Sequence, residues 1–106
     1  MIIIKICDDF TKSPGGRLIE EGAYSGELFR ESILSPKYKE ALKKNEKLTV
    51  DLDGCYGFAT SFLEEAFGGL CRELKDNNIL KHIEIISEDE PGLVEDIESY
   101  VKKALK

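Results

Sequence analysis

The segment LTVDLDGCYGFATSFLEEAFGGL, residues 48–70, decides the fold class of this chain. Its β-branched start, 48–52, is typical of a strand, and a loop bracketed by glycines follows. The next apolar residues repeat at helical spacing and predict a helix over about residues 62–75. They are Leu63, Ala66, Phe67, Leu70 and Leu74. Gly68 and Gly69 weaken a helix interior, so we expect its backbone to pack closely against another element there.

The N-terminal half predicts two strands and a helical region. Residues 2–7 are typical of a strand, a turn follows at 13–17, and residues 17–22 (RLIEEG) predict a second strand that completes a hairpin. After Ser25, apolar residues follow at helical spacing. They are Phe29, Ile33, Leu34, Tyr38, Ala41 and Leu42. Pro36 within this stripe predicts either a break or two short helices.

The C-terminal part predicts one more strand, at 82–87, and a last helix that Pro91 opens. The apolar face of this helix consists of Leu93, Val94, Ile97, Val101, Ala104 and Leu105. The order is then β-β-α-β-α-β-α. It predicts one α/β domain over residues 1–106, with a mixed sheet of about four strands in which 48–52 and 82–87 are parallel.

Composition narrows the classes of function. The chain has 106 residues, of which 42% are hydrophobic and 34% charged, as in a folded globular protein. Its net charge of −6 would repel a phosphate backbone, so we expect no nucleic-acid partner. No apolar run has the length of a signal-peptide core or a membrane span, so we expect a cytoplasmic protein without a membrane partner.

The residues that usually bind metals are few. Cys7, Cys55 and Cys71 are odd in number without the spacing of a zinc site, and His82 is the only histidine. We expect structural thiols, no metal site and no cofactor, with a reactive thiol as the alternative.

Two interpretations of residues 51–64 follow from the residues themselves. Ser61 and Glu64 form an S-x-x-E pattern, in which the serine would cap the helix and the glutamate would reach back to the serine amide. Asp51 and Asp53 form the alternative, because DLDG resembles the DxDG signature of haloacid dehalogenase phosphatases. That resemblance implies a small metal-dependent phosphohydrolase, with Asp51 as nucleophile and Asp53 as acid and base. As strand-end residues, the same aspartates would have no catalytic role.

A third interpretation comes from a wider resemblance. The segment 48–67 resembles the core of STAS domains, the fold of bacterial anti-anti-sigma factors, in which a DSSGL loop carries a regulatory phosphoserine. On that pattern Thr60 and Ser61 match the two serines, and Ser61 falls on the phosphoserine. Ala59 and Phe62 stand where the family has aspartate and glycine.

The chain also resembles a STAS-like group of bacterial domains of unknown function (DUF4325). The resemblance runs from GGR at 15–17 through YSGELFRE at 24–31 to SFLEEAFGGL at 61–70. This group has no settled biochemical role, so its resemblance indicates the fold. The resemblance to anti-anti-sigma STAS domains implies a non-catalytic interaction module in signalling, an anti-sigma factor antagonist-like partner switch controlled at Ser61. Its partner would be a kinase or ATPase-type regulator, and the alternatives are a homodimer or an adaptor in which Ser61 is only a helix cap.

The expected contact surface is the loop after the strand together with the start of the helix. We expect the partner to contact Gly54, Tyr56, Gly57, Phe58, Phe62, Glu64 and Glu65, and we expect Thr60 or Ser61 to accept phosphate. For Phe58 and Phe62, core packing is the alternative to exposure. A phosphate at Ser61 would gain from the helix N-terminus and be opposed by Glu64 and Glu65.

Overall fold

Within the described residues, three parallel strands form the sheet, in the order β1-β2-β3. The computed structural model describes residues 2–76 and 78–105. The strands are β1 (Ile2–Lys5), β2 (Leu48–Asp51) and β3 (Ile83–Ile86). Each β2 residue aligns with one residue on either side: Leu48 lies between Ile2 and Ile83, and Val50 between Ile4 and Ile85. The predicted parallel pairing of β2 with β3 is confirmed, but the predicted four-stranded mixed sheet is wrong.

The predicted second strand at 17–22 is a 3-10 turn, η1 (Ile19–Glu21), instead. The Glu21 carboxylate accepts the amides of Arg17 and Leu18, both at 2.8 Å, so its own side chain takes the place of a partner strand. These bonds hold the pKa of Glu21 below its usual range. Backbone bonds from Gly15 N to Tyr24 O and from Gly26 N to Gly16 O join the two ends of this segment, which is therefore a closed surface loop.

The first crossover is one continuous helical run. A short turn, α1 (Ile6–Asp9), follows β1, and the crossover then consists of α2 (Gly26–Phe29), the π segment η2 (Arg30–Leu34) and α3 (Ser35–Lys43). The alternative of a break at Pro36 is wrong, whereas two short α segments do occur, joined by η2, and α3 begins at Ser35 with Pro36 in its first turn. Proline cannot donate to the carbonyl four residues earlier, and the wider π turn just before Ser35 accommodates that loss.

The second crossover has the same order of helix types, with a π segment between two α segments. It consists of α4 (Thr60–Leu63), the π segment η3 (Glu64–Gly68) and α5 (Gly69–Leu74). A 3-10 turn, η4 (Ile79–Lys81), leads into β3, and α6 (Gly92–Lys103) closes the chain after Pro91, as predicted. The expected close packing at Gly69 is confirmed, because a Cβ there would lie 2.5 Å from Arg30 Nη1.

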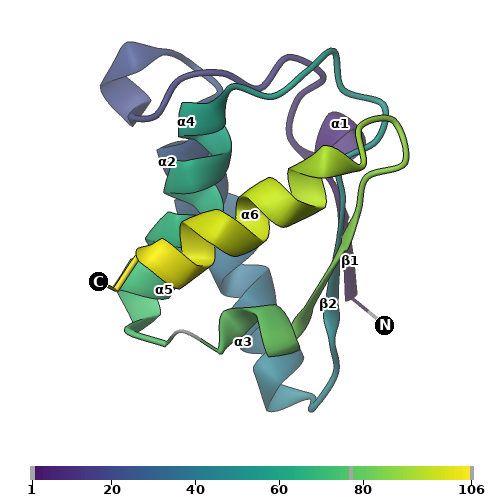
Figure 1. The fold of residues 1–106 in the computed structure, drawn as a ribbon, viewed down its shortest axis with the longest axis vertical. Helices are drawn as coiled ribbons and strands as arrows, with labels where there is room; N and C mark the ends of the chain where they lie inside the picture. Colours follow the sequence, from purple (N-terminus) through teal and green to yellow (C-terminus); the bar gives the residue numbers. More distant parts are fainter. Residues whose placement is uncertain (1, 77, 106) are drawn as a thin grey trace.

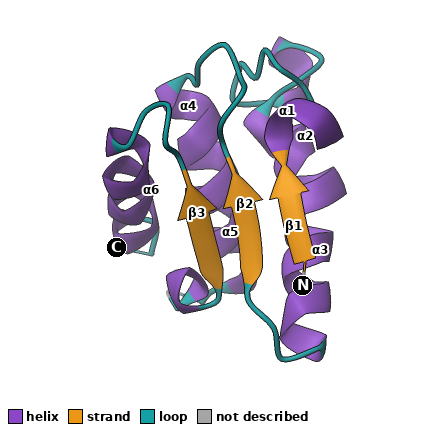
Figure 2. Cartoon of the chain, turned by 90° about the vertical axis from the view of Figure 1, so that its right-hand side faces the viewer, coloured by secondary structure: helices purple, strands orange, loops and turns teal. Residues whose placement is uncertain are grey.

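All of the described helices that pack on the sheet do so from one side. Figure 1 shows the strands at one flank of the molecule with the helices beyond them, and Figure 2 shows the sheet with the helices behind it. Alternation along the strands directs Ile4 and Val50 into the core between the two layers. Phe29 and Phe62 stack there with ring centres 5.7 Å apart, so the two crossovers share one aromatic core. No helix in the described part of the chain is both long and apolar enough to cross a membrane.

Candidate functional site

The loop between β2 and α4 lies at the carboxyl edge of the sheet, where α/β proteins usually place their sites. Hydrogen bonds tie it to the segments on both sides. The amide of Tyr56 donates to Lys12 O at 2.8 Å, and the amide of Gly54 donates to the Asp89 carboxylate at 3.1 Å. Gly54 has φ +92°, and a Cβ there would lie 2.8 Å from Cys7 Sγ, so only glycine fits.

This anchored loop presents Tyr56 to solvent. The side chain of Tyr56 is 83% exposed. A cavity of about 160 Å³ lies beside it, between the loop and the segment after β3. Its lining includes Tyr56, Phe58, Ser87 and Leu93. A fixed backbone that carries an exposed aromatic side chain is suited to binding, because little flexibility is lost on contact.

Both aspartates of DLDG hold the loop backbone. Asp51 Oδ1 accepts the amide of Asp53 at 2.9 Å, and Asp53 Oδ1 accepts the amide of Asp89, also at 2.9 Å. The first bond joins residues two apart and is typical of an Asx turn at a strand end. The second ties the loop to the segment after β3. Among the described residues, no group of three or more His, Cys, Asp or Glu side chains could hold a metal ion.

The predicted capping box at Ser61 is wrong. The helix begins at Thr60 with Ala59 as its N-cap, so Ser61 lies two residues too late to cap it. Glu64, the expected partner of Ser61, instead pairs with Arg17 and Arg72. The serine that does cap a helix is Ser25, whose Oγ accepts the amide of Leu28 at 3.1 Å.

The two candidate phosphoacceptors lie together in the first turn of this helix, where Thr60 is exposed and Ser61 half-buried. The expected contact residues divide into two groups. Gly54, Tyr56 and Gly57 are exposed, while Phe58 is partly buried against Phe62. Phe62 itself is fully buried, so it is a core residue and not a surface anchor.

Glu64 and Glu65 are engaged by arginines. The Arg72 guanidinium binds Glu64 through two bonds, at 2.7 and 3.2 Å, and Arg17 binds the same carboxylate. Hydrogen bonds from Arg72 and Arg17 hold the pKa of Glu64 below its usual range. Arg30 donates to Glu65 Oε2 at 2.6 Å and to the Glu65 carbonyl at 3.2 Å.

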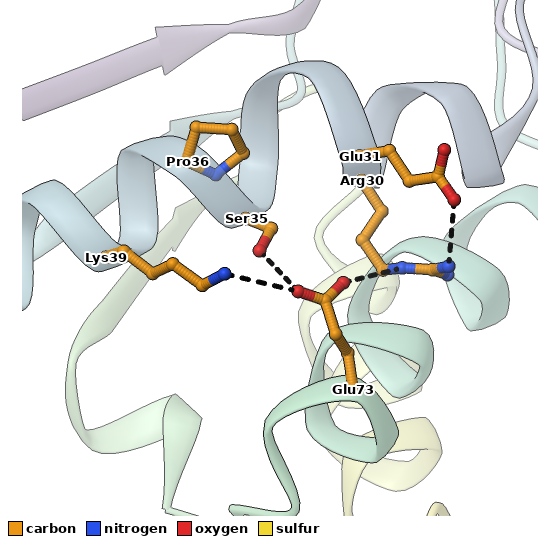
Figure 3. A pocket seen from close by; sticks show the side chains of 6 residues that line it. All are labelled: Arg30, Glu31, Ser35, Pro36, Lys39 and Glu73. Atoms are coloured by element: carbon orange, nitrogen blue, oxygen red, sulfur yellow. Dashed lines mark hydrogen bonds and ion pairs between the residues drawn. The ribbon is translucent and has the colours of Figure 1, made fainter.

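A third glutamate extends this network between the two crossovers. Glu73 accepts Ser35 Oγ at 2.7 Å and pairs with Arg30 at 3.3 Å and Lys39 at 3.7 Å. Figure 3 shows these groups converging on the Glu73 carboxylate in a shallow pocket of about 580 Å³. Because the Glu73 carboxylate already binds Arg30 and Lys39, we assign these ion pairs a role in joining the helices of the two crossovers.

Sequence reasoning missed this network, although one signal was visible. Every arginine of the chain, Arg17, Arg30 and Arg72, is in it, while the cations elsewhere are lysines. Arginine is favoured at half-buried ion pairs because its planar fork matches a carboxylate. The arginines are far apart in sequence, so their partners could not be assigned from spacing.

The three cysteines are free thiols, located in the core or at its border. Cys71 is buried, and Cys7 and Cys55 are half-buried. Burial raises the pKa of Cys55 to about 11, and it also raises the pKa of Cys71. A raised pKa keeps a thiol protonated at neutral pH, which lowers its reactivity.

Comparison with known families identifies the domain. The model of a family described as STAS-like domain of unknown function (DUF4325) matches residues 25–93, more than half of the chain. The chain belongs to this STAS-like family. The matched region runs from the Ser25 cap to the start of α6 and includes residues 52–59, the loop that carries Tyr56. The GGR motif at 15–17 lies outside it. Neither curated proteins nor solved structures gave a match.

Proposed function

We propose that this STAS-like domain is a non-catalytic protein-binding module in the cytoplasm. Its contact surface would be the Tyr56 loop, residues 52–59, together with the exposed Thr60 at the start of α4. The observation that carries this proposal is the 83% exposure of Tyr56 on a backbone bonded to both neighbouring loops. Exposed tyrosines on preorganised backbones are frequent interface anchors.

A capture experiment tests this surface. The tagged wild-type protein and Tyr56→Ala are used to isolate partners from the source cells, and a captured protein is then purified and titrated against both forms. We expect Tyr56→Ala to weaken binding by about tenfold or more, the usual cost of truncating an interface anchor. The control is Leu42→Ala, which truncates an exposed side chain on α3. Equal binding by wild type and Tyr56→Ala would contradict the proposal.

A phosphate on Ser61 is the switch that we propose for this surface. The arrangement of charges supports it: the carboxylates expected to repel a phosphate, Glu64 and Glu65, are already paired with arginines. Ser61 precedes Glu64 by three residues and Glu65 by four, so it lies on the same face of the helix as both carboxylates. Arg17, which pairs with both of them, is therefore on the same side of the helix. A phosphoserine there would gain from the helix N-terminus and from Arg17.

The switch is tested in two steps. Incubation of the protein with extract of the source cells and ATP, followed by site mapping, tests whether Ser61 or Thr60 is modified, with Ser61→Ala and Thr60→Ala as controls. The captured partner is then titrated with Ser61→Asp. We expect weaker binding with an unchanged circular dichroism spectrum. Absence of phosphate at both positions, or wild-type binding by Ser61→Asp, would rule out this switch.

A phosphatase assay tests the non-catalytic part of the proposal. The protein is incubated with a phosphomonoester and Mg²⁺, alongside Asp51→Asn. We expect no turnover above background in either, since both aspartates are engaged in backbone bonds. Turnover that disappears in Asp51→Asn would replace the binding module with the phosphohydrolase interpretation.

A further inference from the structure

One face of the sheet has no helix packed on it within the described residues. Figure 2 shows the strands in front, with α4 and α5 behind them and α6 to the left of β3. Parallel sheets are normally covered on both faces, because their connections place helices there. This bare face is defined by the residues that alternate away from the core: Ile3, Lys5, Thr49, Asp51, Glu84 and Ile86.

The bare face has an apolar and a charged component. Ile3 is 52% exposed, and Ile86 is half-buried. Lys5 and Glu84 are exposed, and neither forms an ion pair with another described residue. Asp51, the remaining charge, accepts the amide of Asp53. The face therefore offers two isoleucines and two exposed charges of opposite sign, Lys5 and Glu84, while the carboxylate of the half-buried Asp51 is bound to a backbone amide.

The strand register places these four residues at the corners of the face. Ile3 is level with Glu84 across β2, and Lys5 is level with Ile86. The exposed charges Lys5 and Glu84 thus lie on one diagonal, and the isoleucines lie on the other.

This arrangement is self-complementary under one kind of two-fold rotation. If the axis lies parallel or perpendicular to the strands, each charge of one copy meets an isoleucine of the other. If the axis follows the isoleucine diagonal, Lys5 meets Glu84 of the second copy twice, while Ile3 and Ile86 each meet their own equivalents. Neighbouring strands of one sheet lie about 4.8 Å apart, which sets the slope of this diagonal. With the axis along it, the strands of the two copies cross near a right angle, an established mode of sheet packing.

The edge of the sheet is less suited to self-association. The amide of Lys5 donates to the Asp9 carboxylate at 2.8 Å, so the end of β1 offers no free donor to another strand. Side chains that take edge amides in this way hinder edge-to-edge pairing. The end of the β1 edge is therefore less open to another strand than the face is.

We propose that the bare face is the interface of a homodimer, with Lys5 of each copy opposite Glu84 of the other. The patch is small, so the dimer is in rapid exchange with monomer and forms at high protein concentration. Its association weakens with added salt, because the charge pairs are partly solvated.

Charge reversal tests the pairing through sedimentation of the full chain. Lys5→Glu alone places like charges opposite each other in a homodimer, and so does Glu84→Lys alone. We expect each to weaken self-association by at least about tenfold. Mixed together, the two variants restore both attractive pairs, so an equimolar mixture should dimerise like the wild type. Only direct contact of residue 5 with residue 84 of another copy gives this rescue.

Two further variants separate the face from the rest of the surface. Ile3→Asn should also yield monomer, whereas Leu42→Asn, on the helical side, should leave the dimer intact. Circular dichroism checks that each variant is folded. A wild type that remains monomeric at all concentrations, or single variants whose mixture stays monomeric, would overturn the proposal. A different protein that occupies the face while the wild type alone is monomeric would overturn it as well.

Discussion

The guanidinium of Arg30 occupies the space that a side chain at position 69 would need: a Cβ on Gly69 would lie 2.5 Å from Arg30 Nη1. That contact allows Arg30 to reach both the carboxylate and the carbonyl of Glu65 in the facing crossover. The Glu65 carbonyl belongs to a π segment, where the regular helical bonds are altered. A glycine that weakens the helix by itself therefore allows the ion pair that joins two helices.

Gly69→Ala should destabilise the protein, although alanine favours a helix by about 1 kcal/mol. The added methyl group would displace Arg30 from Glu65, and we expect a net loss of about 1 kcal/mol or more in denaturant unfolding. The matched control is Gly92→Ala in α6, where a Cβ meets nothing within 4 Å. If Gly69→Ala stabilises the protein as the control does, the close packing of Arg30 is not required.

Arg30→Ala should cost far more than loss of a surface ion pair. The side chains of Arg30 and Glu65 are only 13% and 14% exposed. The variant removes the shortest ion pair of Glu65 and leaves it with the longer contacts to Arg17, at 3.4 Å, and Arg72, at 4.0 Å. We expect a loss of about 3 kcal/mol in the free energy of unfolding. Removal of the exposed partner in the Lys44–Glu40 pair by Lys44→Ala should cost about 0.5 kcal/mol or less. Similar losses for the two variants would mean that the network is well solvated.

The contribution of Glu64 should depend on acid pH. Hydrogen bonds from Arg72 and Arg17 lower the pKa of Glu64 in the folded state. Its stabilisation is therefore complete above the ordinary glutamate pKa and is lost as the pH falls through the lower, folded value. Unfolding of wild type and Glu64→Gln, measured between about pH 7 and pH 3, should show a difference that narrows on acidification. A constant difference would contradict a charge-dependent role, and Glu40→Gln is the surface control.

The two serines near helix starts should respond differently to alanine. Ser25 is fully buried and caps α2, so Ser25→Ala should lower the free energy of unfolding by about 1 kcal/mol. Ser61→Ala should change it by less than about 0.5 kcal/mol, because Ser61 lies inside the first turn and is no cap. A loss at Ser61 as large as that at Ser25 would restore the capping interpretation.

Tyr38→Phe should leave the protein equally stable or slightly more stable. The ring is fully buried, and its hydroxyl has no hydrogen-bond partner among the described residues. Burial raises the pKa of Tyr38 to about 12. Removal of an unsatisfied buried hydroxyl is expected to change the free energy of unfolding by about 0 to +1 kcal/mol. A loss of stability in denaturant unfolding would show that the hydroxyl is bonded in solution.

The local pattern was sufficient for most elements. Hydrophobic spacing predicted the three strands of the sheet, both crossover helices and α6, because each periodicity depends only on which side of its own element is buried. It failed at residues 17–22, where RLIEEG has strand-like composition but Glu21 takes the local amides. At Pro36 it left a break and two short helices as alternatives, and it did not predict the π segment that joins α2 to α3 without a break.

The candidate site was only partly predictable for the same reason. The sequence by itself determined the α/β class, the loop at the carboxyl end of β2 and the position of Thr60 and Ser61 near a helix start. Only the tertiary structure decided that Phe62 is buried, that Tyr56 is exposed, that Glu64 and Glu65 are paired with arginines, and that one face of the sheet is bare. Local periodicity specifies which face of an element is apolar, whereas these outcomes depend on which distant segments pack against that face.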